Sequence, residues 1–160
     1  MSGNVEIVDG KSGSVSDKKF AVAVSEFNKQ VTEKLLDAAL ETLAKHDVPA
    51  EQIEAMWVPG AWELALAAKR VIDRCDAVVC LGAVIKGETT HDAHINSMIS
   101  QMLGKLSVET GKPIAFGVLT CNNADQAIQR SGGKKGNKGV EATMAAIEML
   151  QLFDQLENSN

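Results

Sequence analysis

The stretch Ala77-Val78-Val79-Cys80-Leu81-Gly82-Ala83-Val84-Ile85-Lys86-Gly87-Glu88-Thr89-Thr90-His91 passes from an unbroken apolar run into a short polar turn. Apolar runs without alternation are typical of strands that are covered on both faces of a parallel sheet. Shorter runs of the same kind occupy 20–24, 54–58 and 114–119. These four segments therefore predict the strands of one buried sheet.

Segments with apolar residues at helical spacing separate these runs and follow the last of them. The spacing predicts helices over 30–46, 61–72, 90–110, 123–130 and about 137–156. Strands that alternate with helices indicate βαβ units. The sequence thus predicts an α/β fold, a three-layer α/β/α sandwich with a central parallel sheet, close to the flavodoxin-like arrangement.

Length and composition limit the remaining choices. The 160 residues are 45% apolar and fit a single domain at 19–160, preceded by a flexible N-terminal arm at 1–18 that is rich in Gly and Ser. Within the arm, 5–8 is apolar enough to add an edge strand, for example on a neighbouring subunit. The three scattered cysteines have no metal-ligand spacing and indicate small buried side chains in a reducing compartment.

The charge and hydropathy patterns exclude several partners. A net charge of −5 argues against general nucleic-acid binding. No segment approaches ~20 consecutive apolar residues, so we expect no membrane span, and no apolar leader is present at the start. We therefore expect a cytoplasmic protein.

Ligands of doubly wound sheets bind at the carboxyl ends of the strands, where two segments offer recognition groups. Phe27 can stack on a flat heterocycle, and the amide of Asn28 can pair with a ring edge. The alternative is a Phe that caps the core beside an N-cap Asn. After the next strand, Pro59-Gly60-Ala61-Trp62-Glu63 opens a helix, where Glu63 either binds a polyol or only matches the helix dipole.

The turn 86–91 carries the clearest chemical signal. Gly87 permits a tight turn, so that the amides of 88–90 open a long helix as an anion site, and Lys86 adds positive charge. His91 at the same helix end can transfer protons near neutral pH. His46 and His94 lack such neighbours and are interpreted as surface or packing residues.

A basic segment, 130–139, is the second anion candidate. It lacks the Ser or Thr of a P-loop and follows a helix instead of a strand, so nucleotide binding is rejected. A flexible loop that brings Arg130 to a phosphate is one interpretation. A solvated charged loop is the alternative.

Taken together, these segments resemble the lumazine synthase family from about Phe20 to Leu156. The resemblance is carried by the order and spacing of Phe27-Asn28, Val58–Glu63, Leu81–His91, Glu109-Thr110-Gly111, Phe116–Thr120, Gln126–Arg130 and Gly136-Asn137-Lys138-Gly139. It implies condensation of 5-amino-6-ribitylaminouracil with 3,4-dihydroxy-2-butanone 4-phosphate, in riboflavin biosynthesis, without a metal or cofactor.

The resemblance also implies residue roles. His91 transfers protons, Phe27 stacks on the pyrimidine, and the amides of Glu88 and Thr89 bind the phosphate opposite Arg130. Further substrate contacts fall to Asn28 and Lys86 and to the following residues: Ala61, Trp62, Glu63, Ala83, Val84, Ile85, Phe116 and Lys138. Phe116, Arg130 and Lys138 would come from the neighbouring subunit of a pentamer.

Several implications stay open at the level of the sequence. Pentamers of this family occur alone or as units of an icosahedral capsid, and riboflavin synthase is a candidate partner. Asp92-Ala93-His94 stand where the family has an aromatic, an acidic and an aromatic residue, and Lys86 replaces the commoner Arg. A non-catalytic flavin- or lumazine-binding relative and a shell-forming assembly protein are therefore kept as alternatives.

Overall fold

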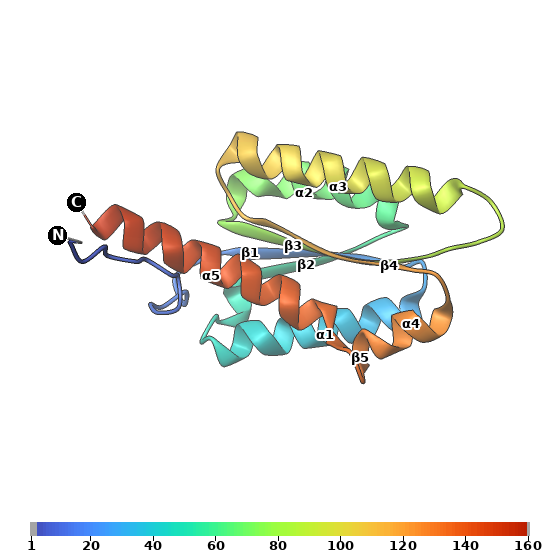
Figure 1. The fold of residues 1–160 in the computed structure, drawn as a ribbon, viewed down its shortest axis with the longest axis horizontal. Helices are drawn as coiled ribbons and strands as arrows, with labels where there is room; N and C mark the ends of the chain where they lie inside the picture. Colours follow the sequence, from blue (N-terminus) through green and yellow to red (C-terminus); the bar gives the residue numbers. More distant parts are fainter. Residues whose placement is uncertain (1–2, 160) are drawn as a thin grey trace.

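A four-stranded parallel sheet forms the middle layer of the molecule (Figure 1). The computed structural model describes residues 3–159. Its strands lie in the order β2-β1-β3-β4 and run in the same direction. Their bounds are β1 Phe20–Ser25, β2 Ile53–Val58, β3 Ala77–Ile85 and β4 Ile114–Cys121. The chain adds β2 beside one edge of β1 and then returns to add β3 beside the other edge of β1. This reversal of the strand order creates a topological switch point between β1 and β3.

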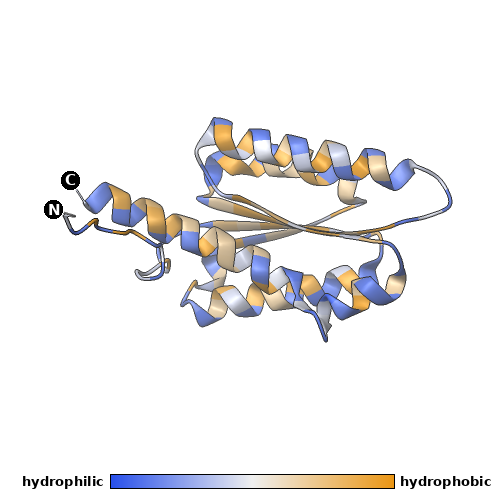
Figure 2. Ribbon diagram, viewed as in Figure 1, coloured by the Kyte–Doolittle hydropathy of each residue, from blue (hydrophilic) through white to orange (hydrophobic). Residues whose placement is uncertain are grey.

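Helices cover both faces of the sheet, which confirms the predicted three-layer class. One face carries α2 (Leu64–Val71) and α3 (His91–Thr110). The other carries α1 (Lys29–Lys45), α4 (Ala124–Gln129) and α5 (Lys138–Asn158) (Figure 1). Buried hydrophobic residues of the helices pack against those of the strands, and along the helix ribbons hydrophobic and hydrophilic residues alternate (Figure 2). No helix among residues 3–159 is both long and apolar enough to span a membrane.

The alternation of side chains along the strands divides the core into two clusters. In β1, Phe20, Val22 and Val24 face α1 and α5, whereas Ala21 and Ala23 face α2 and α3. The larger side chains therefore fill one interlayer space, and the smaller ones leave room for helices to approach the other face. A fully buried Phe or Val contributes roughly 1.5–3 kcal/mol to stability.

A short 3₁₀ turn, η2 (Ala61–Glu63), separates β2 from α2. The helix predicted over 61–72 therefore begins three residues later, at Leu64. The cause is local, because the Glu63 carboxylate accepts a hydrogen bond from the Gly60 amide at 3.0 Å and closes the turn. Two further 3₁₀ turns, η1 (Ala50–Gln52) and η3 (Ile72–Arg74), precede β2 and β3.

The Gly/Lys segment after α4 forms a hairpin that the sequence pattern did not predict. Its strands are β5 (Ser131–Gly133) and β6 (Gly136–Asn137), joined through Lys134 and Lys135. Gly132 and Gly136 adopt φ values of 112° and 83°. These left-handed conformations are readily accessible only to glycine, so the glycines allow the tight return of the chain.

Part of the predicted arm lies against the last turns of α5 (Figure 1). Gln151 donates to the Gly13 carbonyl at 2.7 Å, and Gln155 donates to the Ser12 carbonyl at 3.0 Å. Val15 is fully buried, whereas Val5 is exposed. Side-chain contacts thus tie 12–15 to α5. The division into an arm and one domain, and the edge strand at 5–8, stay predictions.

Candidate functional site

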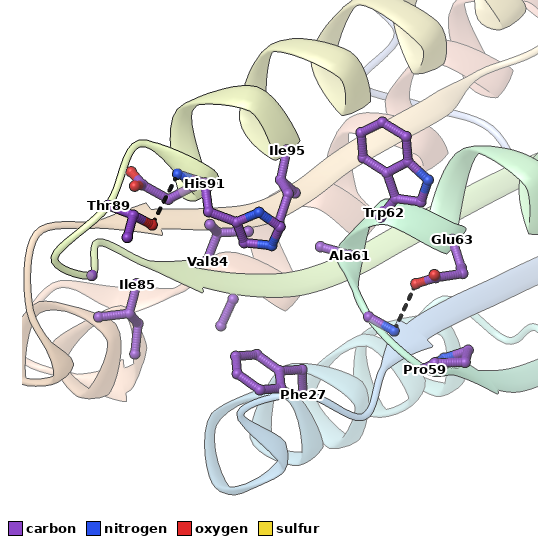
Figure 3. A pocket seen from close by; sticks show the side chains of 14 residues that line it. Phe27, Pro59, Ala61, Trp62, Glu63, Val84, Ile85, Thr89, His91 and Ile95 are labelled. Atoms are coloured by element: carbon purple, nitrogen blue, oxygen red, sulfur yellow. Dashed lines mark hydrogen bonds between the residues drawn. The ribbon is translucent and has the colours of Figure 1, made fainter.

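A cavity of about 560 Å³ opens at the switch point, at the carboxyl ends of β1, β2 and β3 (Figure 3). We call it the first cavity. Most of its wall is apolar, and β3 forms its floor. It is lined by Phe27, Pro59, Gly60, Ala61, Trp62, Glu63, Ala83, Val84, Ile85, Gly87, Thr89, His91, Asp92 and Ile95. The structure therefore brings together side chains from both recognition segments and from the turn before α3.

Phe27 stands at the edge of the first cavity, in the loop that joins β1 to α1. Its side chain is 71% exposed, which is unusual for a large apolar group. The backbone of the loop is fixed, because the Glu26 amide donates to the Val58 carbonyl at 2.8 Å and the Phe27 amide donates to the Pro59 carbonyl at 3.2 Å. An exposed ring on a fixed backbone is suited to stack on a planar ligand.

The turn after β2 supplies a second wall. Ala61 is buried, Trp62 is half exposed, and the Glu63 carboxylate is held by the Gly60 amide. In Figure 3 the carboxylate of Glu63 lies beside this turn, with Trp62 above it. One carboxylate oxygen is engaged in the turn, so the other remains available to accept hydrogen bonds from hydroxyl groups.

The loop 86–90 and the start of α3 close the cavity on the side of β3. Thr89 Oγ1 accepts a hydrogen bond from the His91 amide at 3.3 Å. Among the described residues, the amides of Gly87, Glu88, Thr89 and Thr90 donate to no protein acceptor. Free amides beside the positive end of a 20-residue helix attract anions. In Figure 3 the His91 ring and the Phe27 ring lie on either side of the end of β3.

Three predicted site residues, Asn28, Lys86 and Glu88, line neither the first cavity nor the second one described below. Lys86 and Glu88 are exposed and lie in the loop that precedes α3. The Asn28 amide nitrogen donates to the Ala83 carbonyl at 2.8 Å. This nitrogen therefore contacts the protein itself, and the contact of Asn28 with a ring edge stays a prediction.

A separate cavity of about 570 Å³ lies at the edge strand β4, between this strand, α4 and the start of α5. We call it the second cavity. It contains the remaining predicted residues and shares no lining residue with the first cavity. It is lined by Phe116, Val118, Leu119, Thr120, Cys121, Asp125, Gln126, Gln129, Arg130, Lys135 and Lys138.

The second cavity is electropositive. Arg130, Lys135 and Lys138 face one acidic lining residue, Asp125. Lys138 pairs with Glu141 at 3.5 Å at the start of α5, and no ion pair joins Arg130 or Lys135 to a described residue. Two unpaired cations in one cavity are suited to bind a phosphate ester.

The three cysteines are buried and carry free thiols. Burial raises the pKa of Cys80 to about 12 and that of Cys75 to about 11. Burial also raises the pKa of Cys121, while the nearby Arg130 guanidinium opposes that rise. These thiols are therefore protonated at neutral pH and serve as small core side chains. Among residues 3–159, no cluster of His, Cys, Asp and Glu could hold a metal ion.

Sequence reasoning missed several lining residues. Ile95 follows His91 by one helical turn, so the helical period alone places it on the same face. Lys135 lies within the basic segment that was identified, but its contribution to the cavity depends on the unpredicted hairpin. Pro59 and Gly60 belong to the quoted motif, and no role was given to them.

Comparisons with known proteins give matches that agree with one another. The family model described as 6,7-dimethyl-8-ribityllumazine synthase matches residues 17–154. Proteins of that name from Rhodopirellula baltica and Halorhodospira halophila are 44% and 41% identical over 147 and 155 residues. These matches cover 91% and 96% of this chain and 95% and 99% of the relatives. The chloroplastic protein of the same name from Arabidopsis thaliana is 48% identical over 139 residues, which cover 85% of this chain and 61% of the relative.

Proposed function

Because the chain belongs to the 6,7-dimethyl-8-ribityllumazine synthase family, we propose that its two cavities are the two halves of the active site of that synthase. The chain is a transferase of riboflavin biosynthesis. It condenses 5-amino-6-ribitylaminouracil with 3,4-dihydroxy-2-butanone 4-phosphate to 6,7-dimethyl-8-ribityllumazine. The observation that carries the assignment of the site is the placement of Phe27, Glu63 and His91 around one cavity.

In the first cavity, Phe27 stacks on the pyrimidine. The backbone of Ala83, Val84 and Ile85 lies along the ring edge, and Ala61, Trp62 and Glu63 hold the ribityl chain. The free Glu63 oxygen accepts from its hydroxyl groups. This division matches the lining, where apolar walls adjoin a carboxylate that is already oriented by Gly60.

The phosphate ester lies at the loop before α3, where free amides of Glu88 and Thr89 donate to its oxygens. Arg130 and Lys138 neutralise the remaining charge. They line the second cavity of the same chain, so they reach the first cavity of an adjoining copy in this proposal. Phe116, exposed on the edge strand β4, contributes the outer wall of that shared site.

The chemistry needs orientation and proton transfer. The substrate amine adds to the ketone and water leaves, which gives an imine. Elimination of inorganic phosphate, tautomerisation of the enol and ring closure with loss of a second water follow. Proximity accounts for much of the acceleration. His91 transfers the protons of these steps from the rim of the first cavity.

A closed ring of copies would form such shared sites between all of its neighbours, and we propose the pentamer. The arm segment 5–8, in which Val5 and Ile7 are exposed, adds a strand to a neighbour in this assembly. The proposal extends to the assembly of pentamers into a capsid and to riboflavin synthase as a partner. A cytoplasmic location also belongs to it.

A complementation experiment tests the shared site. One variant carries His91→Ala in the first cavity, and the other carries Arg130→Ala in the second. The two are co-expressed with different tags, and mixed assemblies are purified through both tags. Random assembly leaves about one quarter of the sites with two intact halves, since each half is intact with a chance of about one half. With the butanone phosphate kept well below its KM, where sites that lack Arg130 contribute little, we expect fluorescent lumazine at about a quarter of the wild-type rate.

The matched control is the double variant His91→Ala/Arg130→Ala co-expressed with wild type. There too about a quarter of the sites have two intact halves, so it gives the same rate. If mixed single variants stay at the level of either variant alone while this control is active, both residues act within one chain, and the shared site is wrong.

A further inference from the structure

We propose that Asn28 is a positioning residue that fixes the gap between the Phe27 ring and the β3 wall of the first cavity. The inference rests on the proposed function, in which that gap receives the pyrimidine. It assigns Asn28 to the protein side of the site, since its amide nitrogen contacts the Ala83 carbonyl and not the cavity.

The backbone at Asn28 is unusual. Asn28 lies in the left-handed region, with φ 62° and ψ 43°, directly before α1. Asparagine tolerates this region better than other residues that have a Cβ. The left-handed turn changes the direction of the chain between β1 and α1. It also brings the Asn28 amide within 2.8 Å of the Ala83 carbonyl, which belongs to a different strand.

The loop that bears Phe27 is thereby attached on two sides. Toward β2, the amides of Glu26 and Phe27 donate to the carbonyls of Val58 and Pro59. Toward β3, the side chain of Asn28 attaches the loop through its hydrogen bond to the Ala83 carbonyl. At the start of α1, the Asn28 carbonyl accepts from the amides of Val31 and Thr32 at 2.9 and 3.1 Å. Residue 28 therefore joins the loop, the helix and the cavity wall.

This attachment matters because Phe27 has little packing of its own. Its ring is 71% exposed, so its position is set by the backbone beneath it. Ala83 lines the cavity and is buried. The hydrogen bond from Asn28, the residue after Phe27, to the Ala83 carbonyl sets the distance between the Phe27 ring and the cavity wall. Binding of a flat ring is sensitive to that distance, because dispersion contacts weaken steeply over fractions of an ångström.

Two substitutions separate the hydrogen bond from the backbone requirement. Asn28→Gly keeps the left-handed conformation accessible and removes the amide. Asn28→Asp keeps size and conformation, and replaces the donor with an oxygen that faces the Ala83 carbonyl. For either variant we expect KM for the ribitylaminouracil to rise about three- to tenfold, the range of one lost hydrogen bond. KM for the butanone phosphate stays close to wild type, and the melting temperature falls by roughly 1–6 °C because a hydrogen bond within the protein is lost.

Asp47→Gly is the matched control. Asp47 has φ 60°, the only other positive value for a non-glycine residue among 3–159, and it lies at the far end of α1 from Phe27. The substitution changes the left-handed backbone in the same way. We expect neither KM to change.

A double-mutant cycle with Phe27→Ala decides how Asn28 acts. If Asn28 positions the ring, the effect of Asn28→Gly on KM disappears in the Phe27→Ala background. An unchanged effect in that background means that Asn28 touches the substrate directly, and it overturns the inference. An unchanged KM in both Asn28 variants overturns it as well. Wild-type protein that forms no lumazine contradicts the proposed function itself, which distinguishes the two failures.

Discussion

The two cavities have nearly the same volume but differ in the residue types and structural elements that line them. The first lies where β1, β2 and β3 end, and its walls are apolar groups on buried strands and hydrogen-bonded turns. The second lies outside the edge strand β4, and its functional groups are long cations on a short helix, a hairpin and the start of α5. The first is mostly apolar and has the Glu63 and Asp92 carboxylates in its wall, whereas the second is electropositive.

This difference suits the two cavities to different parts of the substrates. A planar ring requires a preformed gap, and the switch point of a doubly wound sheet provides one from fixed backbone. A phosphate needs charge more than shape, and flexible cations at an edge strand supply charge at many geometries. Under the proposed function, the first cavity therefore sets recognition of the heterocycle, and the second tunes binding of the anionic substrate.

The largest expected effect comes from the proton-transfer group of the first cavity. His91→Gln removes the titratable ring and keeps a polar side chain of similar length. We expect kcat to fall about 10²-fold, the lower end of the contribution of general acid–base catalysis. KM for both substrates should change little. Lumazine fluorescence under saturating substrate measures this.

His94→Gln is the matched control, because His94 is exposed on the same helix and lines neither cavity. It should leave kcat within about twofold of wild type, as surface substitutions usually do. A His91→Gln variant that behaves like His94→Gln would move proton transfer to another group. Asp92, which lines the first cavity, would then be the next residue to change.

A smaller effect is expected from the second cavity. Arg130→Gln removes a charge and a bidentate donor, so KM for the butanone phosphate should rise about tenfold or more. Arg130→Lys should lie between this variant and wild type. KM for the pyrimidine should be unchanged, which separates the two cavities. Arg70→Gln, on exposed α2 surface, serves as the control. A rise in both KM values would contradict the division of work.

Much of the fold follows from the sequence, because its strands are continuous apolar runs and its helices have clear spacing. The apolar run predicts a strand over 76–85, which is almost the observed range of β3. The hairpin at 131–137 escaped prediction, since its strands contain mainly Gly and polar residues and show no alternation of apolar groups. The late start of α2 escaped as well, because the Glu63–Gly60 contact competes with the helical hydrogen bonds that propensity alone would favour.

The site was predicted in its residue types more than in its contacts. Phe27 and His91 follow strand ends, so topology alone brings them to one cavity. The bond from Asn28 to Ala83 joins residues 55 positions apart and depends on the left-handed turn, which no local pattern specified. Within one chain, Arg130 and His91 line different cavities. This separation likewise depends on the position of β4 at the sheet edge.

The smallest expected effect uses Cys121 as a reporter of charge in the second cavity. Burial raises the pKa of this thiol, and Arg130 lowers it. Only the thiolate reacts with alkylating reagents, so the labelling rate rises with pH around that pKa. In a Cys75→Ala/Cys80→Ala background, Arg130→Gln removes the stabilising cation, and the midpoint of the labelling profile should move to higher pH. Mass spectrometry of iodoacetamide-labelled protein measures it, with Arg70→Gln as the control. A midpoint that stays in place or moves to lower pH would mean that Arg130 points out of the second cavity, and the electropositive half of the comparison would fail.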